Sequence, residues 1–317
     1  MTSSLVAPST QTKGAVFEFV VKKLLEMNDY EKCQPDNEQV DINGRIRGRG
    51  EWHQIDAFGR WKYTIPFVYP IRLLCEAKCW TKRVDLPVIR NFVGVVKDIS
   101  ENYFVEDNQD IDKKMLSKRH TDCGAVFSVS GYTERAQRYA YAQNVFLVSY
   151  DNNPIINKFK KTIEDIALFS RLASSKDKKD FSKWLEDTLT GYTHNQPPNR
   201  FLLDREGFEK SAAVLREEFG RIRTSIVGIA TGVYPIHLLS YNEIPKGLFR
   251  DRDEVNFRTA PRKTENGGFY FEIFPSNSPH KQHFNFRIKK GYQSIYGGIE
   301  SNIPDWAFTR LTDASPC

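Results

Sequence analysis

Apolar residues near the start of the chain recur at the spacing of an α-helix. Residues 16–25 carry one apolar stripe, which consists of Phe17, Val20, Val21 and Leu24. Glu18 lies at the edge of this stripe. The pattern therefore predicts a helix that has an acidic side chain at the border of its apolar face.

Strand and helix patterns then alternate as far as Tyr150. Apolar runs predict strands at residues 39–43, 53–58, 71–80, 125–130 and 145–148. Helical periodicity predicts helices at residues 88–99 and 134–143. The polar segment 100–122 predicts a surface insertion between two of these elements. This alternation is typical of an α/β domain.

A glycine-rich turn separates the first two predicted strands. Residues 44–50 contain three arginines, Arg45, Arg47 and Arg49. Arginine forms bidentate hydrogen bonds to phosphate, so these side chains are candidate contacts to a nucleic-acid backbone. An exposed basic turn that is only solvated fits the same pattern equally well.

The pattern changes after residue 153. Helices are predicted at residues 154–172, 179–189 and 204–222, with a turn-rich linker at residues 191–200. From residue 224 onward the chain is rich in Gly, Pro and aromatic residues and alternates at 268–274 and 283–288, which predicts strands. We therefore expect an N-terminal domain of residues 1–153 and a C-terminal α+β domain of residues 154–317, which recognises a target or regulates the first domain.

Length, composition and charge agree with two globular domains. The chain has 317 residues, of which 40% are hydrophobic and 27% charged, which excludes a disordered or collagen-like protein. Lys and Arg number 46 against 40 Asp and Glu, and the resulting net charge of +6 permits nucleic-acid binding.

Cysteine usage and hydropathy indicate the compartment. Five cysteines without a Cys-x-x-Cys pair argue against a disulfide scaffold and a zinc ribbon. No apolar run approaches the roughly 20 residues that span a bilayer, and the N-terminus lacks the pattern of a signal peptide. We expect a soluble, cytoplasmic protein that has no membrane partner.

The strand predicted at residues 71–80 carries charged residues in its middle. Side chains two residues apart share a strand face, so Glu76 and Lys78 point together. The opposite face is apolar and contains Cys75, Ala77 and Cys79. Charges within an otherwise apolar strand cost free energy unless they pair or hold a metal, so this face indicates a functional site.

Asp56 and Glu76 are the candidate metal ligands. Two carboxylates that approach each other repel, and a divalent cation such as Mg²⁺ or Mn²⁺ relieves the repulsion through oxygen ligands. A metal held there can polarise a phosphodiester oxygen and lower the pKa of a bound water. Lys78 can orient that water or neutralise the charge of the transition state. The pattern therefore favours hydrolysis of a phosphodiester.

The ordered set of motifs resembles the PD-(D/E)xK nucleases and, within them, the Mrr-like restriction endonucleases. The resemblance covers roughly residues 13–150. Its pieces are Gly14 with Phe17-Glu18, Gln54-Ile55-Asp56, Cys75-Glu76-Ala77-Lys78, Phe92-Val93-Gly94, and the strand, Ser-Gly turn and helix start at residues 128–136. The last piece is independent of the acidic residues.

The resemblance implies a restriction-endonuclease-like mixed sheet flanked by helices and a Mg²⁺-dependent endonuclease. By this resemblance Asp56, Glu76 and the backbone carbonyl of Ala77 would hold the metal, Lys78 would activate water, and Glu18 would be an auxiliary catalytic acid. Gln54 shares a strand face with Asp56 and would contribute to substrate binding. The departures are Ile55, where the motif's name has proline, and the insertion at residues 100–122. The implied substrate is DNA, and the implied role is defence against foreign DNA.

Several alternatives stay open at the level of sequence. The same catalytic set serves nucleases that act on branched DNA or on RNA, and the C-terminal domain can gate the nuclease through a regulatory ligand or partner protein. Cutting both strands needs two active sites, so we expect a homodimer. A nucleic-acid-binding module without activity is the non-enzyme alternative, because a Glu-x-Lys pair alone is more typical of a salt-bridged strand face.

Overall fold

The protein begins with one long helix. The structure, a computed structural model, describes residues 10–33, 35, 39–63, 65–102, 119–150, 154–170, 175–190, 202–222, 224–230, 234–240, 260–263, 269–273, 282–289, 292–294 and 299–301. The helix is α1 (Thr10–Met27), and the predicted apolar stripe is buried along it. The helix predicted at residues 16–25 is confirmed.

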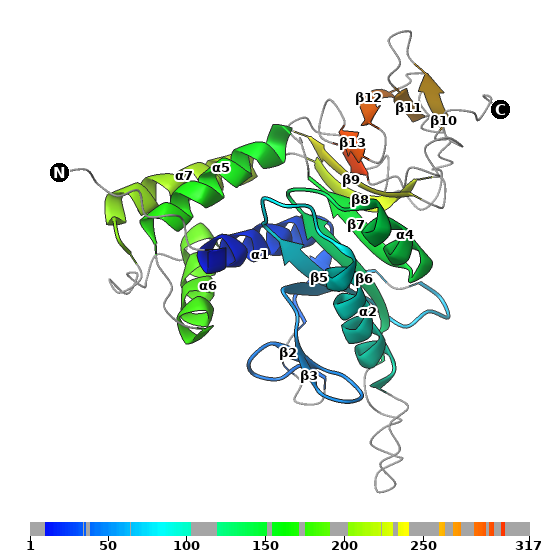
Figure 1. The fold of residues 1–317 in the computed structure, drawn as a ribbon, viewed down its shortest axis with the longest axis horizontal. Helices are drawn as coiled ribbons and strands as arrows, with labels where there is room; N and C mark the ends of the chain where they lie inside the picture. The colour runs from blue at the N-terminus through cyan, green and yellow to red at the C-terminus, as the bar shows by residue number, and fades with distance from the viewer. Residues whose placement is uncertain are drawn as a thin grey trace, which may run out of the picture.

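A five-stranded mixed sheet follows α1, in the order β1-β4-β5-β6-β7. The strands are β1 (Tyr30–Glu31), β4 (Ala57–Trp61), β5 (Ile71–Lys78), β6 (Thr121–Ser128) and β7 (Val145–Ser149). β1, β4 and β5 pair antiparallel, whereas β5, β6 and β7 pair parallel. Parallel neighbours need crossover connections, which contain helices α2 (Leu86–Ser100) and α4 (Glu134–Ala142). The predicted mixed sheet flanked by helices is confirmed (Figure 1).

The central strand β5 separates two apolar cores. Leu73, Cys75 and Ala77 belong to the core that contains the buried face of α1. Leu74 belongs to the second core, together with buried residues of α2 and α4. Because side chains alternate along a strand, the later residues Glu76 and Lys78 share the face of Leu74. The chain therefore places Glu76 and Lys78 where β5 leaves the second core.

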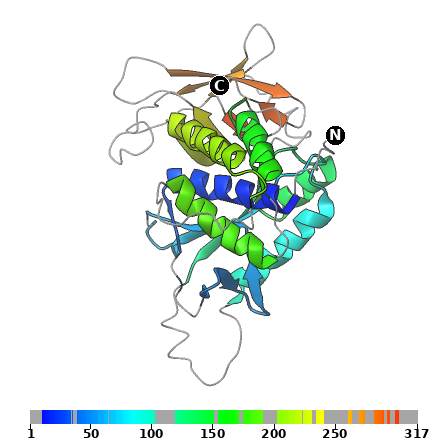
Figure 2. The same cartoon turned by 90° about the vertical axis from the view of Figure 1, so that its left-hand side faces the viewer.

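Three helices after residue 153 extend the first core. They are α5 (Pro154–Phe169), α6 (Ser175–Thr190) and α7 (Arg205–Arg221). Figure 2 shows α1 between α6 on one side and the α5–α7 pair on the other. Phe159, Phe181 and Phe208 are fully buried in the core that α1 contributes to. The division into domains at residues 153 and 154 stays a prediction, although this core crosses it.

From residue 224 onward, the described part of the chain consists of strands. The first sheet contains β8 (Thr224–Ala230), β9 (Tyr234–Ser240) and β14 (Ile299–Ser301), and the second contains β10 (Ala260–Lys263), β11 (Phe269–Ile273), β12 (Gln282–Lys289) and β13 (Tyr292–Ser294). The strands predicted at residues 268–274 and 283–288 correspond to β11 and β12. The predicted linker at residues 191–200 and most of the predicted insertion at residues 100–122 lie outside the described residues.

The prediction for residues 39–58 is wrong in its details. No strand spans residues 39–43, where Val40 makes only an isolated bridge to Ile46. Instead, β2 (Arg45–Arg47) and β3 (Trp52–Gln54) form a small hairpin inside and after the predicted turn. The backbone reverses earlier because the Asp41 side chain accepts hydrogen bonds from the backbone N–H groups of Asn43 and Arg45. We call residues 45–54 the β2–β3 arm.

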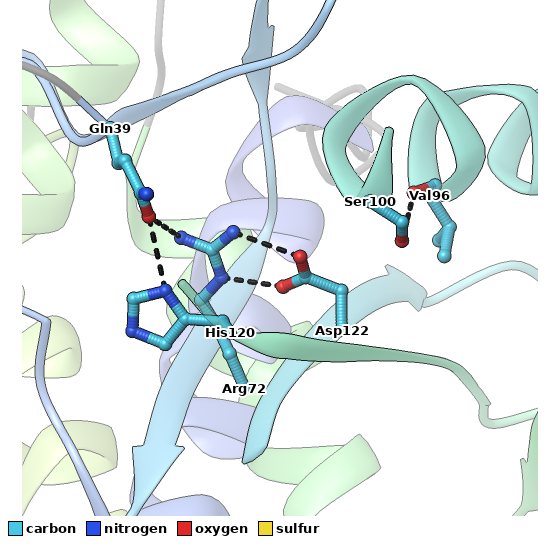
Figure 3. Close-up of polar contacts among 6 residues, drawn as sticks. All are labelled: Gln39, Arg72, Val96, Ser100, His120 and Asp122. Carbon is cyan, nitrogen blue, oxygen red and sulfur yellow. Dashed lines mark hydrogen bonds and ion pairs between the residues drawn. The ribbon is translucent and has the colours of Figure 1, made fainter. Parts of the chain in front are cut away.

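A buried ion pair ties β5 to β6 at the end of the sheet where both strands begin. Arg72 and Asp122 are aligned neighbours in the parallel pairing. The Arg72 guanidinium donates two hydrogen bonds to the Asp122 carboxylate, of 2.6 and 3.1 Å. Gln39 Oε1 lies 3.4 Å from the guanidinium and 3.0 Å from His120 Nδ1 (Figure 3). Both charged side chains are less than 5% exposed, so each depends on the other for compensation.

Replacing Arg72 by Met should lower the free energy of unfolding by about 3–5 kcal/mol, because it leaves the buried Asp122 carboxylate without its cation. The double variant Arg72→Met/Asp122→Leu should recover most of this loss, since no buried charge then remains unpaired. Urea unfolding followed by circular dichroism measures both changes. Equal stability of the single and double variants would contradict this account of the pair.

Candidate active site

Asp56 and Glu76 meet where β4 begins and β5 ends. Ala57 is aligned with Cys75 in the antiparallel pairing, so Asp56, one residue earlier, comes beside Glu76. Asp56 Oδ2 accepts a hydrogen bond of 2.9 Å from the backbone N–H of Ala77. This bond fixes the Asp56 carboxylate beside the segment of β5 that carries Glu76 and Lys78.

Lys78 brings one positive charge to both carboxylates. Its Nζ atom pairs with Glu76 Oε1 and lies 3.9 Å from Asp56 Oδ2. The three side chains are between 17 and 23% exposed, so solvent reaches the cluster. The cluster shows that both carboxylates can approach a single cation.

Trp80 is a neighbour of the cluster that sequence reasoning did not single out. Lys78 Nζ lies 5.6 Å from the centre of the Trp80 ring, a distance typical of a cation–π contact. Trp80 is 38% exposed. The spacing of two residues from Lys78 is the signal that could have placed the two side chains together.

A serine-glycine turn holds the end of β5. The Val129 N–H donates to the Lys78 carbonyl at 3.2 Å, and Ser130 Oγ donates to the Lys82 carbonyl at 2.6 Å. Gly131 has a φ of +73°, a conformation that favours glycine, and its carbonyl accepts from the Val84 N–H. The Ser-Gly turn therefore fixes the backbone of Lys78 and of the segment that follows it.

Cys75 does not belong to the chemical face of β5. It is fully buried on the α1 side of the strand. Burial, and to a smaller extent the negative charge of Asp56, raise the pKa of its thiol well above the ordinary value. Since a metal binds the thiolate, Cys75 is a core residue and no metal ligand.

Two other predicted residues lie near the cluster in sequence or in the fold. Glu18 is half-buried on α1, the helix that covers the opposite face of β5. Its role as an auxiliary acid stays a prediction. Gln54 is exposed at the end of β3, two residues before Asp56. Its contribution to binding stays a prediction as well.

The structure separates the three arginines of the predicted turn. Arg45 lies on β2, where its guanidinium donates to Asp41 at 2.8 Å and lies 5.9 Å from the Trp52 ring. Arg47 lies 5.7 Å from the same ring. Only Arg49 is at the tip of the arm, where its side chain is 54% exposed and 3.9 Å from Glu101. The arm thus presents cations around one indole ring.

A polar latch fixes the arm to the last turns of α2. Asp98 pairs with His53 Nε2 at 2.6 Å and accepts the backbone N–H of Gly50 at 2.9 Å. The Asp98 carbonyl accepts the backbone N–H of Arg49 at 2.8 Å. Partial burial works against the Asp98 carboxylate, but hydrogen bonds from His53, Gly50 and Glu51 outweigh it and lower the pKa of Asp98.

The donor set of the cluster fits a hard divalent cation. In the part of the chain that the structure describes, no group of three His, Cys, Asp or Glu side chains is placed to hold a metal ion. Mg²⁺ needs fewer protein ligands, because it keeps several waters and is commonly held by one or two carboxylates. Asp56 and Glu76 supply such a pair around one cation.

Comparison with known families gives the class of the part of the chain that contains this cluster. Residues 10–152 match the Mrr_cat family model, which is described as restriction endonuclease. No curated protein and no solved structure matches the chain. The matched part is therefore a nuclease domain of the PD-(D/E)xK kind. Residues 10–152 belong to the Mrr-like restriction endonuclease family.

Among the described residues, none of the helices combines the length and apolar character needed to cross a membrane.

Asp98→Asn should weaken the dependence of protein stability on pH in the acid range. The pKa of Asp98 is lowered by folding, so its ionised form stabilises the protein above the unfolded value of about 3.9. This contribution is lost as the pH falls through the folded-state pKa. Thermal unfolding at pH 7, 5, 4 and 3 should show wild type above Asp98→Asn near neutrality and the difference between them narrowing as the pH is lowered. A constant difference in stability across this range would contradict the stabilising role of the ionised Asp98 carboxylate.

Proposed function

We propose that the protein is a divalent-metal-dependent endonuclease that hydrolyses phosphodiester bonds of DNA, and that it acts in restriction or defence. The observation that carries the proposal is the position of a single cation, Lys78 Nζ, between Asp56 and Glu76. The family match supports a nuclease that acts on DNA.

Each residue of the cluster has a distinct task in this proposal. Asp56 and Glu76 would hold Mg²⁺, or Mn²⁺ in its place, and the Ala77 carbonyl would be a further ligand. The bound metal would polarise a phosphodiester oxygen and lower the pKa of a coordinated water. Lys78 orients the water that attacks phosphorus and offsets the negative charge that develops on the phosphoryl oxygens. Glu18 assists as an auxiliary acid.

The Ala77 N–H has a positioning task. Its hydrogen bond to Asp56 Oδ2 holds in place the carboxylate that would bind the metal. The Ser-Gly turn holds the next residue, Lys78, through its carbonyl. Both contacts reduce the reorganisation that the site needs before reaction.

DNA reaches the site along the β2–β3 arm in this proposal. Gln54 and Asp56 are separated by a single residue, so a duplex that contacts the arm also meets the carboxylates. Arg49 is the arginine with the most exposed position on the arm, and it contacts phosphates, while Arg45 and Arg47 lie beside Trp52. Two copies of the chain would cut the two strands of a duplex.

Lys78→Ala and Asp56→Asn should each lower the rate of DNA cleavage by about 10²–10⁴-fold, the range for loss of a positioned acid–base or charge-stabilising group. Plasmid nicking and linearisation in Mg²⁺, in Mn²⁺ and in EDTA measure the rate, with unmodified and methylated plasmid in parallel. Wild type should cut with either metal and not in EDTA.

Lys210→Ala is the matched control for Lys78→Ala. Lys210 is exposed on α7 and pairs with Glu206, far along the chain from the cluster. The control should cut like wild type. Cleavage by Lys78→Ala at the wild-type rate would overturn the proposal, and so would equal cutting in EDTA.

Arg49→Ala should weaken DNA binding similarly on all sequences. A lost phosphate contact lowers the slope of log Kd against log salt concentration by about 1. Fluorescence anisotropy with a labelled duplex between 50 and 300 mM salt measures the slope. Arg205→Ala, on the exposed start of α7, is the control. An unchanged slope in Arg49→Ala would show that the arm tip is only solvated.

A further inference from the structure

The loop between β4 and β5 exposes an unusual number of large apolar side chains. Tyr63, Ile65, Val68 and Tyr69 are each between 37 and 56% exposed, and Phe67 is fully exposed. We call residues 62–70 the β4–β5 loop; Thr64 lies outside the described residues. Single exposed apolar residues are ordinary, but a contiguous group of them marks an interaction surface.

The loop backbone holds Phe67 outward in a conformation that costs free energy. Phe67 has a φ of +64°, in the left-handed region that bulky residues rarely adopt. The Val68 N–H donates to the Ile65 carbonyl at 3.1 Å and closes a turn around Phe67, and proline residues stand at positions 66 and 70. Prolines restrict the loop further. Neither the strained backbone nor the solvated ring contributes to the apolar cores.

The charges beside the loop favour a polyanion as its partner. Lys62 is exposed, and its ammonium group forms no ion pair within the described residues. The Arg119 guanidinium lies 5.9 Å from the Tyr69 ring. Arg60 stands at the base of the loop, 3.0 Å from Glu31. Aromatic rings interleaved with cations are typical of surfaces on which nucleic-acid bases stack.

The loop joins the two strands of the active site at their far ends. Asp56 precedes β4 and Glu76 lies near the end of β5, whereas the loop connects the end of β4 to the start of β5. At about 3.3 Å per residue, the eight residues of β5 span about 25 Å. With a rise of about 3.4 Å per base pair, this length corresponds to roughly seven base pairs of duplex.

We infer that the β4–β5 loop is a second nucleic-acid contact, which stacks Phe67 and Tyr69 on unpaired or unstacked bases roughly seven base pairs from the scissile phosphate. The inference rests on the proposed function only for the choice of DNA as the substrate. It deepens that function, because it makes locally unpaired DNA the preferred form of the substrate. Lys62 and Arg119 contact the backbone beside the stacked bases.

Binding by the full chain tests this inference, in a Lys78→Ala background that suppresses cleavage. The probes are two fluorescein-labelled 30-base-pair duplexes, one fully paired and one with a four-nucleotide bubble. Phe67→Asn removes the ring and retains a residue that tolerates positive φ. It should weaken binding of the bubble about tenfold and of the paired duplex less than twofold, as expected for the loss of one stacked base.

A second readout reports stacking directly. With 2-aminopurine in the bubble, binding of the parent protein should quench the fluorescence, and Phe67→Asn should abolish the quenching. Phe67→Tyr should restore it, because a Tyr ring still stacks. Val214→Asn, a polar replacement at an exposed site on α7, should behave like the parent protein in both assays.

Four results would overturn the inference. They are the absence of DNA binding by the parent protein, equal affinity of the parent for both duplexes, equal losses on both duplexes in Phe67→Asn, and unchanged quenching in Phe67→Asn. A switch from dimer to monomer in Phe67→Asn, measured by light scattering, with DNA binding unchanged would assign the surface to a second copy. Loss of sedimentation with phosphatidylglycerol vesicles, again with DNA binding unchanged, would assign it to lipid.

Failure of the inference differs from failure of the proposed function. Metal-dependent cleavage without a preference for the bubble overturns the stacking contact and leaves the nuclease in place. Cleavage by Lys78→Ala at the wild-type rate overturns the catalytic assignment, while the stacking contact is then judged on the binding data alone.

Discussion

The candidate site depends on strand pairing that keeps two carboxylates together at the junction of β4 and β5. Asp56 and Glu76 repel each other, and their separation is fixed by the strand pairing that aligns Ala57 with Cys75. The Ala77 N–H and the Lys78 ammonium offset this repulsion in the protein without metal. In the proposed function a divalent cation would do so more strongly, which would link strand register to metal binding and to catalysis.

Charged side chains are accommodated differently at the two ends of β5. Arg72 at the beginning is enclosed with Asp122, and neither side chain reaches solvent to any large extent. Glu76 and Lys78 at the end of the strand are accessible to solvent. Their ion pair can therefore be replaced by contacts with other charged groups. The Arg72–Asp122 pair stabilises the sheet, whereas the Glu76–Lys78 pair leaves an edge of the sheet that solvent reaches. The exposed β4–β5 loop lies at the enclosed end, so the same hairpin carries both the proposed catalytic cluster and the proposed stacking surface.

Sequence patterns predicted the elements whose apolar periodicity is long. The helices α1 and α2 and the parallel strands β5, β6 and β7 fall where apolar spacing places them, because burial selects their residues. The β2–β3 arm escaped prediction, because its strands are three residues long and a side chain, that of Asp41, decides where the chain turns. The contact of Lys78 with Asp56 and the hydrogen bonds of Asp98 with the arm join residues that are far apart in the chain. Local patterns in a single sequence do not show which distant residues pair.

Metal binding by Asp56 and Glu76 is tested most directly by a titration with Mn²⁺, in which electron paramagnetic resonance measures the free ion. If Asp56 and Glu76 hold the metal and Lys78 only shares their charge, wild type binds Mn²⁺ and Asp56→Asn and Glu76→Gln lose at least about tenfold in affinity. Lys78→Ala should bind Mn²⁺ at least as tightly as wild type, because a competing cation is gone. Loss of binding in Lys78→Ala, or unchanged binding in Asp56→Asn, would contradict the account.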